Sequence, residues 1–286
     1  MSLLATSITA AVALVMMYTG MSVSPRRLRE ILSRGDLKNI AWLAAVNYAV
    51  IPLAVLVFAG AGGQISGLGL ALLILAVLPC APLVPSLVAL LDEAPEWAIL
   101  VFIVFSLVSL VGVVLLTVLL DAGGYIAGAG QPHGQDLYRG LAGYLAAVFV
   151  PLLLGMLLRV FTGAWQQSLL RVLRPVAGIS LLVTLLAFVV VNRTALLGVS
   201  LRDMAIIAAF NVFCIALVFP YRRAAGDRWL AGLLTTGFRN IALAMPFSIV
   251  VLGSSEVPVY IMVYVLAALV TCVPAVIGAR LVQGRG

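Results

Sequence analysis

The stretch LPCAPLVPS (residues 78–86) places Pro79, Pro82 and Pro85 three residues apart within a long apolar run. Each proline removes a backbone hydrogen-bond donor, and its ring clashes with the carbonyl group one turn upstream. The whole run extends from residue 66 to residue 91, which is long enough to cross a bilayer. A helix over this run is therefore expected to break near the middle of the membrane.

A second interrupted run lies in the other half of the chain. The stretch TTGFRNIALAMP (235–246) holds Gly237, the charged Arg239, Asn240 and Pro246 among apolar residues, and it predicts a second break. One broken helix in each half is typical of a transporter built from inverted repeats, with its substrate site between the breaks. The simpler alternative is a pair of ordinary proline kinks without a transport role.

The composition indicates that lipid is the main solvent of the chain. Of the 286 residues, 64% are apolar and 9% are charged, against roughly 45–50% and about 25% in soluble domains. These values exclude a soluble globular protein and predict an all-α polytopic protein in a lipid bilayer. The basic residues lie in short loops between apolar runs, so the net charge of +7 indicates membrane topology rather than nucleic-acid binding.

Nine apolar segments have the length of a membrane span. They cover residues 3–23, 40–59, 66–91, 97–120, 137–161, 176–192, 204–221, 229–252 and 257–280. We expect a single transmembrane transporter domain over residues 1–286. Within it, about 1–120 forms a first repeat that lacks one helix, and about 137–286 forms the second repeat. The first apolar segment is predicted to be a spanning helix rather than a removed signal.

The distribution of basic residues gives an independent test of this count, because lysine and arginine accumulate in cytoplasmic loops. With the N-terminus outside, the inside loops contain Arg26, Arg27, Arg29, Arg34, Lys38, Arg159, Arg171, Arg174, Arg222, Arg223, Arg228, Arg280 and Arg285. The outside loops contain only Arg139, Arg193 and Arg202. This distribution predicts a multi-pass protein with its N-terminus outside and its C-terminus in the cytoplasm. The single lysine against sixteen arginines is typical of a high-GC bacterial gene, so the expected location is the bacterial inner membrane.

Arg239 is the remaining basic residue, and it falls inside the eighth span. All ten acidic residues fall in loops or at span edges, so Arg239 is predicted to have no carboxylate partner. Burying such a charge costs about 2.5–3.5 kcal/mol on insertion scales, which makes it a candidate functional residue. Its partners would be backbone carbonyls, water or an anionic ligand. A purely structural role, holding the carbonyl ends of the broken helices, is the alternative.

The spans contain no acid pair, histidine-bearing metal site or serine–histidine pair. Intramembrane catalysis needs one of these arrangements. We therefore expect neither an enzyme nor a bound metal or cofactor.

Several short motifs resemble the bile acid:sodium symporter family, within the wider group that includes arsenite and auxin efflux carriers. In chain order they are YTGMSVSP (18–25), NYAVIP (47–52), LPCAP (78–82), VPLLLG (150–155), Asn211 and GFRN (237–240). Their order and their coincidence with both breaks carry the resemblance. It implies a panel domain and a core domain, two crossing broken helices in the core, and alternating access between them.

The resemblance also implies where sodium would bind, and the residues at those positions differ here. The family's Glu and Gln on the second broken helix correspond to Thr235 and Arg239, and its Gln on the second span corresponds to Asn47. Its Ser-Asn pair corresponds to Leu87 and Val88. Ser106 and Ser109 are the other positions that we assign to the former cation site. Hard cations need several oxygen ligands, and leucine and valine supply none. A fixed guanidinium at a cation position would also repel sodium.

We therefore expect a secondary transporter of small organic anions that is not coupled to sodium. The predicted substrate-binding residues are Arg239, Asn240, Asn211, Ser86 and Thr236. The N-termini of the half-helices after each break would add positive partial charge. Uniport or exchange is expected, because the spans offer no carboxylate or histidine to carry a proton.

Two other functions stay open on the same fold. Cys80 directly precedes a break, where a thiolate could bind a soft metalloid in an arsenite-type efflux carrier. The simpler interpretation of Cys80 is a small buried apolar residue. The other function is that of a ligand-binding sensor that keeps the fold without transport. The sequence leaves the oligomeric state open, a monomer included.

Overall fold

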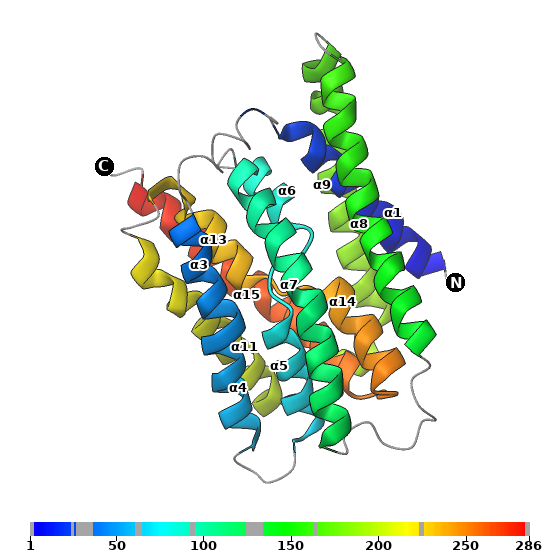
Figure 1. Ribbon diagram of the computed structural model, residues 1–286, viewed down its shortest axis with the longest axis vertical. Coiled ribbons are helices and arrows are strands. Elements are labelled where there is room, and N and C mark those ends of the chain that lie inside the picture. The colour runs from blue at the N-terminus through cyan, green and yellow to red at the C-terminus, as the bar shows by residue number, and fades with distance from the viewer. Residues whose placement is uncertain are drawn as a thin grey trace.

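The computed structural model describes residues 3–23, 26, 37–60, 65–91, 95–123, 134–162, 165–222 and 226–283. Every regular element in these ranges is a helix, and most of the helices run along the length of one elongated bundle (Figure 1). Among the predicted inside residues, Arg27, Arg29, Arg34, Arg223 and Arg285 lie outside the described ranges.

The first five predicted spans coincide with helices. They are α1 (Leu3–Ser22), the continuous run of α3 (Leu37–Ala45), η1 (Val46–Val50) and α4 (Ile51–Gly60), the pair α5 (Gly67–Val77) and α6 (Val84–Leu90), then α7 (Pro95–Ala122) and α8 (Gly134–Thr162). The gap between α5 and α6 is the break predicted from the three prolines.

Helices also cover the remaining four predicted spans. They are α9 (Gln166–Val191), α11 (Leu201–Val218), the run of α13 (Trp229–Gly237), α14 (Ile241–Pro246) and η5 (Phe247–Val251), and α15 (Val257–Gln283), with the short elements α10 (Arg193–Leu197), η3 (Phe219–Tyr221) and η4 (Gly226–Arg228) between them. The second predicted break separates α13 from α14.

Four helices of the described chain are long and apolar enough to cross a membrane. They cover Leu37–Gly60, Glu96–Ala122, Leu201–Tyr221 and Val257–Gly278, and shorter apolar helices cover Ala10–Ser22, Gly67–Val77 and Ala146–Thr162. The surface between the helix ends is apolar, with Val57, Leu119 and Val190 each more than 60% exposed. Such a surface is typical of a protein whose solvent is lipid. The number of nine crossings stays a prediction.

One boundary differs clearly from the sequence prediction. Helix α9 begins at Gln166, ten residues before the predicted span, so Arg171 and Arg174 lie on a helix rather than in a loop. The physical reason is the apolar spacing that continues outward: Leu170 and Leu173 lie three residues apart, and both pack against Tyr18 of α1 and its neighbours.

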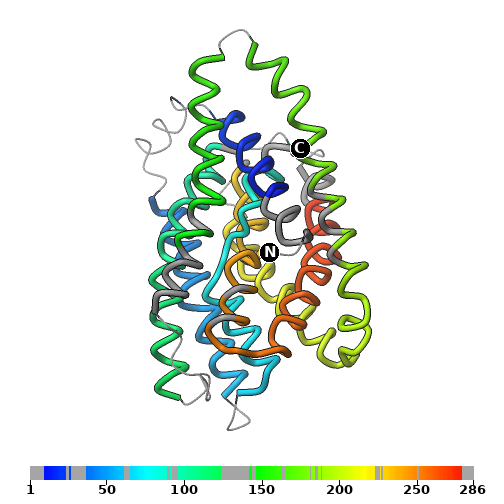
Figure 2. Tube along the Cα trace, turned by 90° about the vertical axis from the view of Figure 1, so that its right-hand side faces the viewer, coloured from blue at the N-terminus to red at the C-terminus, as the bar shows by residue number. Residues whose placement is uncertain are grey.

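The helices form two packed groups. Helix α1 packs against α8 and α9, whereas the other long helices pack around α5, α13 and α15. In Figures 1 and 2 the three-helix group, which we call the α1–α8–α9 layer, lies along one side of the larger group. Stacked rings of Phe102 on α7 and Phe149 on α8, with centroids 5.8 Å apart, connect the two groups.

Two glycines set the distance between α1 and α8. A Cβ atom at Gly20 would lie 2.1 Å from the carbonyl oxygen of Leu152, and one at Gly155 would lie 2.2 Å from the carbonyl oxygen of Met17. No side chain fits in this space, so the two backbones approach as closely as in other small-residue membrane interfaces. Helices α1 and α8 are therefore held together by direct backbone packing.

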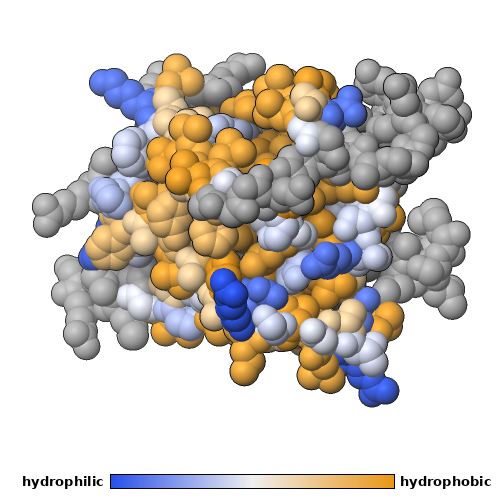
Figure 3. Space-filling model, turned by 90° about the horizontal axis from the view of Figure 1, so that it is seen from below, coloured by the Kyte–Doolittle hydropathy of each residue, from blue (hydrophilic) through white to orange (hydrophobic). Residues whose placement is uncertain are grey.

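The lower end of the molecule shows hydrophilic residues standing among hydrophobic ones (Figure 3). Among the residues at helix ends, Arg202 and Asp203 lie in the first turn of α11, which Ser200 caps by accepting a hydrogen bond from the backbone N–H of Asp203 at 3.1 Å. Polar helix ends of this kind are expected where a bundle meets the membrane–water interface.

Candidate functional site

The two breaks lie against each other in the interior of the larger group, and backbone hydrogen bonds join them. The N–H of Cys80 donates to the carbonyl of Thr235 at 3.1 Å, that of Ala81 to Phe238 at 2.9 Å, and that of Asn240 to Leu78 at 2.7 Å. In an apolar solvent each unpaired backbone group would cost several kcal/mol. The breaks are possible because each one satisfies backbone groups of the other.

Local sequence explains the first break. Cys80 has a φ of +63°, a left-handed conformation that disfavours helix continuation for a residue with a side chain. Pro79 and Pro82 flank it, whereas Pro85 lies in the first turn of α6, where a missing N–H is tolerated. Pro79 and Pro82 are therefore the prolines at the interruption, and Pro85 helps to start the next half-helix.

The second break depends on Asn240 rather than on proline. The side-chain oxygen of Asn240 accepts a hydrogen bond from the N–H of Leu243 at 3.2 Å and caps α14. Pro246 lies at the other end of α14, where a π-helical turn, η5, begins. The extended segment is thus the short stretch from Phe238 to Asn240, and Arg239 lies in its centre.

Arg239 is completely buried, and two side chains accept hydrogen bonds from its guanidinium. Its Nη1 donates to Oδ1 of Asn47 at 2.9 Å, and its Nη2 donates to Sγ of Cys214 at 3.1 Å. The guanidinium carbon also lies 5.9 Å from the ring centroid of Phe210, a cation–π distance. The Nε atom has no hydrogen-bond partner among the described residues.

Asn47 is the residue that connects this charge to two other elements. Besides accepting from Arg239, its amide nitrogen donates to the carbonyl of Leu43 at 2.8 Å and to the hydroxyl of Thr236 at 3.0 Å. It lies in the π-helical turn η1, where the N–H of Ile51 bonds the carbonyl of Val46. Pro52 follows at once and lacks the N–H of a regular helix. Single π-helical turns inside α-helices occur frequently at functional sites.

Asn211 and Tyr264 act on the backbone at the end of α13. Both side chains donate to the carbonyl of Gly237, Asn211 from its amide nitrogen at 3.2 Å and Tyr264 from its hydroxyl at 2.6 Å. The Oδ1 atom of Asn211 is buried and has no hydrogen-bond partner among the described residues. The carbonyl that the break leaves without a helical partner is therefore satisfied twice.

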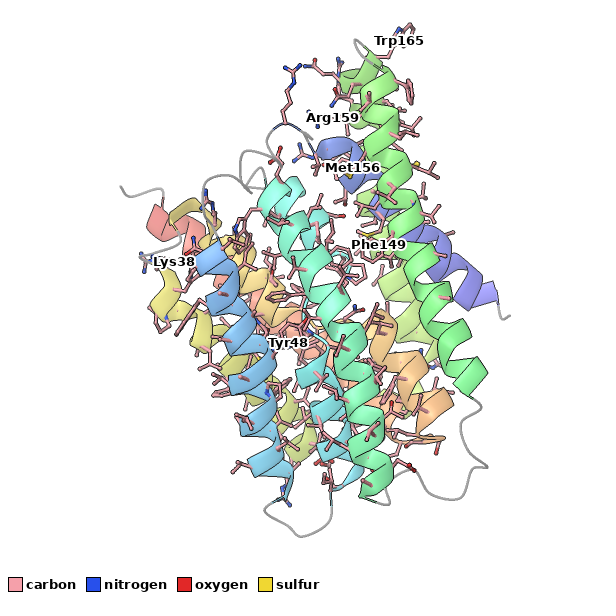
Figure 4. The ribbon with its side chains drawn as sticks, viewed as in Figure 1. Lys38, Tyr48, Phe149, Met156, Arg159 and Trp165 are labelled. Atoms are coloured by element: carbon pink, nitrogen blue, oxygen red, sulfur yellow. The ribbon has the colours of Figure 1, made fainter. Side chains whose placement is uncertain are left out.

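The other positions compared with sodium ligands are distributed around this centre. Buried hydroxyls of Thr235 and Ser106 have no partner in the described part of the chain. Ser109 lies 3.1 Å from the hydroxyl of Tyr48, which also donates to the carbonyl of Phe105. Figure 4 places Tyr48 about midway along the molecule. Leu87 and Val88 contribute apolar surface to the core and no ligand atom.

Ser86 lies apart from the centre, at the contact between α6 and α1. Its hydroxyl lies within hydrogen-bond distance of the carbonyl of Val15, at 3.2 Å, and of the hydroxyl of Thr19, and its single proton is donated to one of these acceptors at a time. Thr19 in turn donates to the same Val15 carbonyl at 2.8 Å. This small polar cluster joins the α1–α8–α9 layer to the first broken helix.

The structure thus brings together Arg239, Asn47, Thr236 and Asn211 around the two breaks, while Asn240 serves the backbone and Ser86 the contact with α1. Sequence reasoning missed Cys214 and Phe210 as partners of the guanidinium. Both lie on α11 within one turn of Asn211 and four residues apart, on one helical face. Nothing in the sequence distinguishes them from packing residues.

The arrangement forms a positively charged centre without a compensating carboxylate among the described residues. An amide oxygen, a neutral sulfur and an aromatic ring stabilise the guanidinium by dipole and quadrupole interactions only. No group of three His, Cys, Asp or Glu side chains that could hold a metal ion occurs in the described chain. Chemically, such a centre attracts anions and repels cations.

Comparison with known protein families identifies a family for this chain. The model of the family described as Sodium Bile acid symporter family matches residues 9–199. The match covers two thirds of the chain and includes α5, α6 and the first break, and it ends before α11. No curated protein matches the sequence.

Proposed function

Because the chain belongs to the sodium bile acid symporter family, we propose that it is a secondary transporter of small organic anions that works by alternating access without sodium coupling. The family supports a membrane transporter of the bile acid and sodium symporter type, with a lipid bilayer as its environment and a small molecule as its substrate. The nature of the anion and the absence of sodium coupling are the specific content of the proposal.

One observation carries the proposal: Arg239 is fully buried at the crossing of the broken helices and is bonded to Asn47. By resemblance, both residues stand at sodium-ligand positions. At an effective dielectric constant of about 20, a sodium ion about 4 Å from the guanidinium would be repelled by about 4 kcal/mol. Since about 1.4 kcal/mol changes an affinity tenfold, the sodium affinity would fall by roughly a thousandfold.

The same charge supports an anionic substrate. The described partners of the guanidinium are neutral, and its Nε atom has none. A carboxylate or sulfonate reaching this centre would gain charge-assisted hydrogen bonds, which are roughly twice as strong as neutral ones. Thr236 and Asn211, both completely buried beside the breaks, would add neutral contacts.

Alternating access needs two bodies that move against each other. The α1–α8–α9 layer corresponds to the panel domain that the family resemblance implies, and the larger group corresponds to the core domain. The cluster of Ser86, Thr19 and the Val15 carbonyl is one polar contact between them. We expect this contact to be made in one orientation of the two bodies and broken in the other.

The orientation in the membrane follows the charge distribution. Arg159 lies near the upper end of the molecule and Lys38 lies at the upper end of α3 (Figure 4), and both are predicted inside residues. The positive-inside rule then assigns this end to the cytoplasm and the opposite end to the outside of a bacterial inner membrane.

The decisive experiment compares cations at constant ionic strength. Thermal stabilisation of the purified protein by benzoate, pyruvate and taurocholate, and uptake of the stabilising compound into proteoliposomes, are measured in sodium, potassium and choline chloride. Equal responses in the three salts are expected. A steep sodium dependence would contradict the proposal.

Arg239→Gln tests the role of the guanidinium, with Arg202→Gln at the exposed end of α11 as the charge-matched control. We expect the first variant to lose stabilisation by anions and the second to keep it. If Arg239→Gln keeps the wild-type affinity and only melts at a lower temperature, Arg239 is a structural residue.

The same experiments separate the two other functions. An arsenite-type efflux carrier would depend on Cys80, which is buried in the first break; unchanged metalloid tolerance in Cys80→Ala cells would exclude it. A sensor would bind an anion in the thermal assay but show no counterflow of the labelled compound in proteoliposomes.

A further inference from the structure

A pocket separate from the crossing helices lies between the C-terminal end of α1 and the N-terminal end of α9. Its volume is about 340 Å³, and it is lined by Tyr18 and Ser22 of α1 and by Gln167, Leu170, Arg171 and Arg174 of α9. It shares no residue with the centre around Arg239. The pocket exists because α9 begins ten residues before the apolar span and continues alongside the end of α1.

The rim of the pocket is basic. Arg171 and Arg174 lie three residues apart on α9, so both guanidinium groups project from the same face of the helix. The described lining contains these two cations, a glutamine amide and two hydroxyl-bearing residues. Guanidinium groups bind phosphate through several charge-assisted hydrogen bonds in a fixed planar geometry. The chemistry of the rim therefore selects a phosphate-bearing anion.

The floor of the pocket is apolar. Tyr18 is only 4% exposed, and its ring belongs to a small cluster with Val15 and Ala177, against which Leu170 and Leu173 pack. Farther along α9, away from the pocket, Val176, Ile179, Leu182 and Val183 are all more than 40% exposed. A ligand with a phosphate and long apolar chains could place the phosphate at the basic rim and the chains along the apolar surface of α9.

The pocket also lies at the depth where lipid head groups occur. Arg171 and Arg174 directly precede the apolar span of α9, and Trp165, which is 79% exposed, stands just before that helix at the upper end of the molecule (Figure 4). Exposed tryptophans and basic residues together mark a membrane–water interface. Basic pockets between membrane helices at this depth bind anionic lipid head groups.

We propose that this pocket is a binding site for a phosphate group, supplied by an anionic phospholipid such as phosphatidylglycerol. The two arginines contact the phosphate, the floor formed by Tyr18 and Leu170 receives the glycerol backbone, and the acyl chains follow the exposed face of α9. Because α1 and α9 are both in the α1–α8–α9 layer, the lipid would fasten this layer to the membrane while the larger group moves.

The test uses the full-length protein purified in a neutral detergent. The melting temperature is measured with added phosphatidylglycerol, phosphatidylcholine or inorganic phosphate, and native mass spectrometry counts the lipids retained. The probe variant is Arg171→Ala with Arg174→Ala. The control is Arg193→Ala with Arg202→Ala, which removes the same charge at the starts of α10 and α11.

Stabilisation of the wild type by phosphatidylglycerol over phosphatidylcholine, with an affinity at least tenfold weaker in the probe variant and unchanged in the control, supports the site. Equal stabilisation by inorganic phosphate at the same concentration would assign the site to a soluble phosphate compound. An unchanged lipid preference in the probe variant, or the same loss in the control, would overturn it. If the probe variant is poorly folded, Arg171→Lys with Arg174→Lys is expected to keep most of the preference. If this double lysine variant is folded but has lost the preference for phosphatidylglycerol completely, electrostatic recognition of the phosphate is contradicted.

Discussion

The buried pair of Arg239 and Asn47 makes an unusual prediction: removing the neutral partner should harm the protein more than removing the charge. Asn47→Leu leaves the completely buried guanidinium without its amide acceptor. Removing one partner of a buried charge costs up to about 3–5 kcal/mol, and only the sulfur of Cys214 and the ring of Phe210 remain as described partners of the guanidinium. The lost hydrogen bonds to Leu43 and Thr236 add to this cost.

Arg239→Met has opposing effects that nearly cancel. The substitution relieves a burial cost of about 2.5–3.5 kcal/mol. It leaves Oδ1 of Asn47 unpaired, which costs about 1–3 kcal/mol, and it removes the contact with Phe210. The net change in the free energy of unfolding is therefore within about 2 kcal/mol of zero. The double variant should be close to Arg239→Met, which gives a coupling energy of at least about 2 kcal/mol between the two sites.

The assay is reversible unfolding in mixed lipid and dodecyl sulfate micelles, followed by tryptophan fluorescence, for the wild type, both single variants and the double variant. Asn47→Asp is the control for packing, because it keeps an acceptor oxygen and nearly the same volume; its stability should lie between those of the wild type and Asn47→Leu. If the two single effects add in the double variant to within about 0.5 kcal/mol, Asn47 does not hold the guanidinium and the reasoning fails.

Three further predictions concern other contacts. Gly20→Ala should destabilise the protein by about 1–3 kcal/mol, because its Cβ would lie 2.1 Å from a carbonyl oxygen of α8. The control Gly143→Ala, with open space around it, should not lower the melting temperature. Equal effects of the two substitutions would refute the close approach of α1 and α8. Ser86→Ala should cost about 0.5–1.5 kcal/mol and change the rate of exchange transport, since it removes the contact with Thr19; an unchanged rate would show that this contact does not respond to the movement. At Cys80, whose φ is +63°, valine should lower the melting temperature more than glycine, because β-branched residues strongly disfavour this conformation; the opposite order would indicate that packing outweighs backbone strain there.

The sequence was sufficient to locate both breaks, because proline and glycine act on the backbone within a few residues of their own position. The interruption after Val77 follows from Pro79 and Pro82, and the one after Gly237 from the Gly-Phe-Arg-Asn stretch. Family membership, predicted from short motifs around these breaks, is confirmed by the match over residues 9–199. The effects of proline and glycine on the backbone, and the order of short motifs, can be predicted from the sequence without knowledge of the packing.

The partners of Arg239 could not be predicted, because they depend on contacts across more than twenty residues of sequence. Expected partners were carbonyls, water or a ligand, whereas the described donor bonds go to Asn47 and Cys214. A cysteine in an apolar helix carries no sequence signal that distinguishes a packing role from a hydrogen-bond acceptor. The roles proposed for Thr236 and Asn211 toward a substrate stay predictions.

Helix ends were also beyond the reach of an apolar count. The predicted span of α9 begins only where continuous apolar residues begin, but the helix continues outward to Gln166 through polar residues that fit an interface. The arginines of the pocket between α1 and α9 were consequently assigned to a loop. Their approach to α1 depends on packing by Leu170 and Leu173, which only the three-dimensional arrangement reveals.

The backbone hydrogen bonds between the two breaks have a consequence for biosynthesis. Cys80 and Thr235 are more than 150 residues apart, and at about 5–20 residues per second the ribosome needs roughly 8–30 s to add the second segment after the first. During this interval the first broken helix lacks the groups that satisfy its backbone. We expect the first broken helix to stay out of contact with lipid but accessible to water during this interval. It would pack into the core only after the second segment has been synthesised. The test uses a Cys214→Ala background. Cys80 should react with a maleimide in arrested chains that end before Trp229, and it should be protected in the complete protein, where it is buried. Equal protection in both would show that the first half assembles alone.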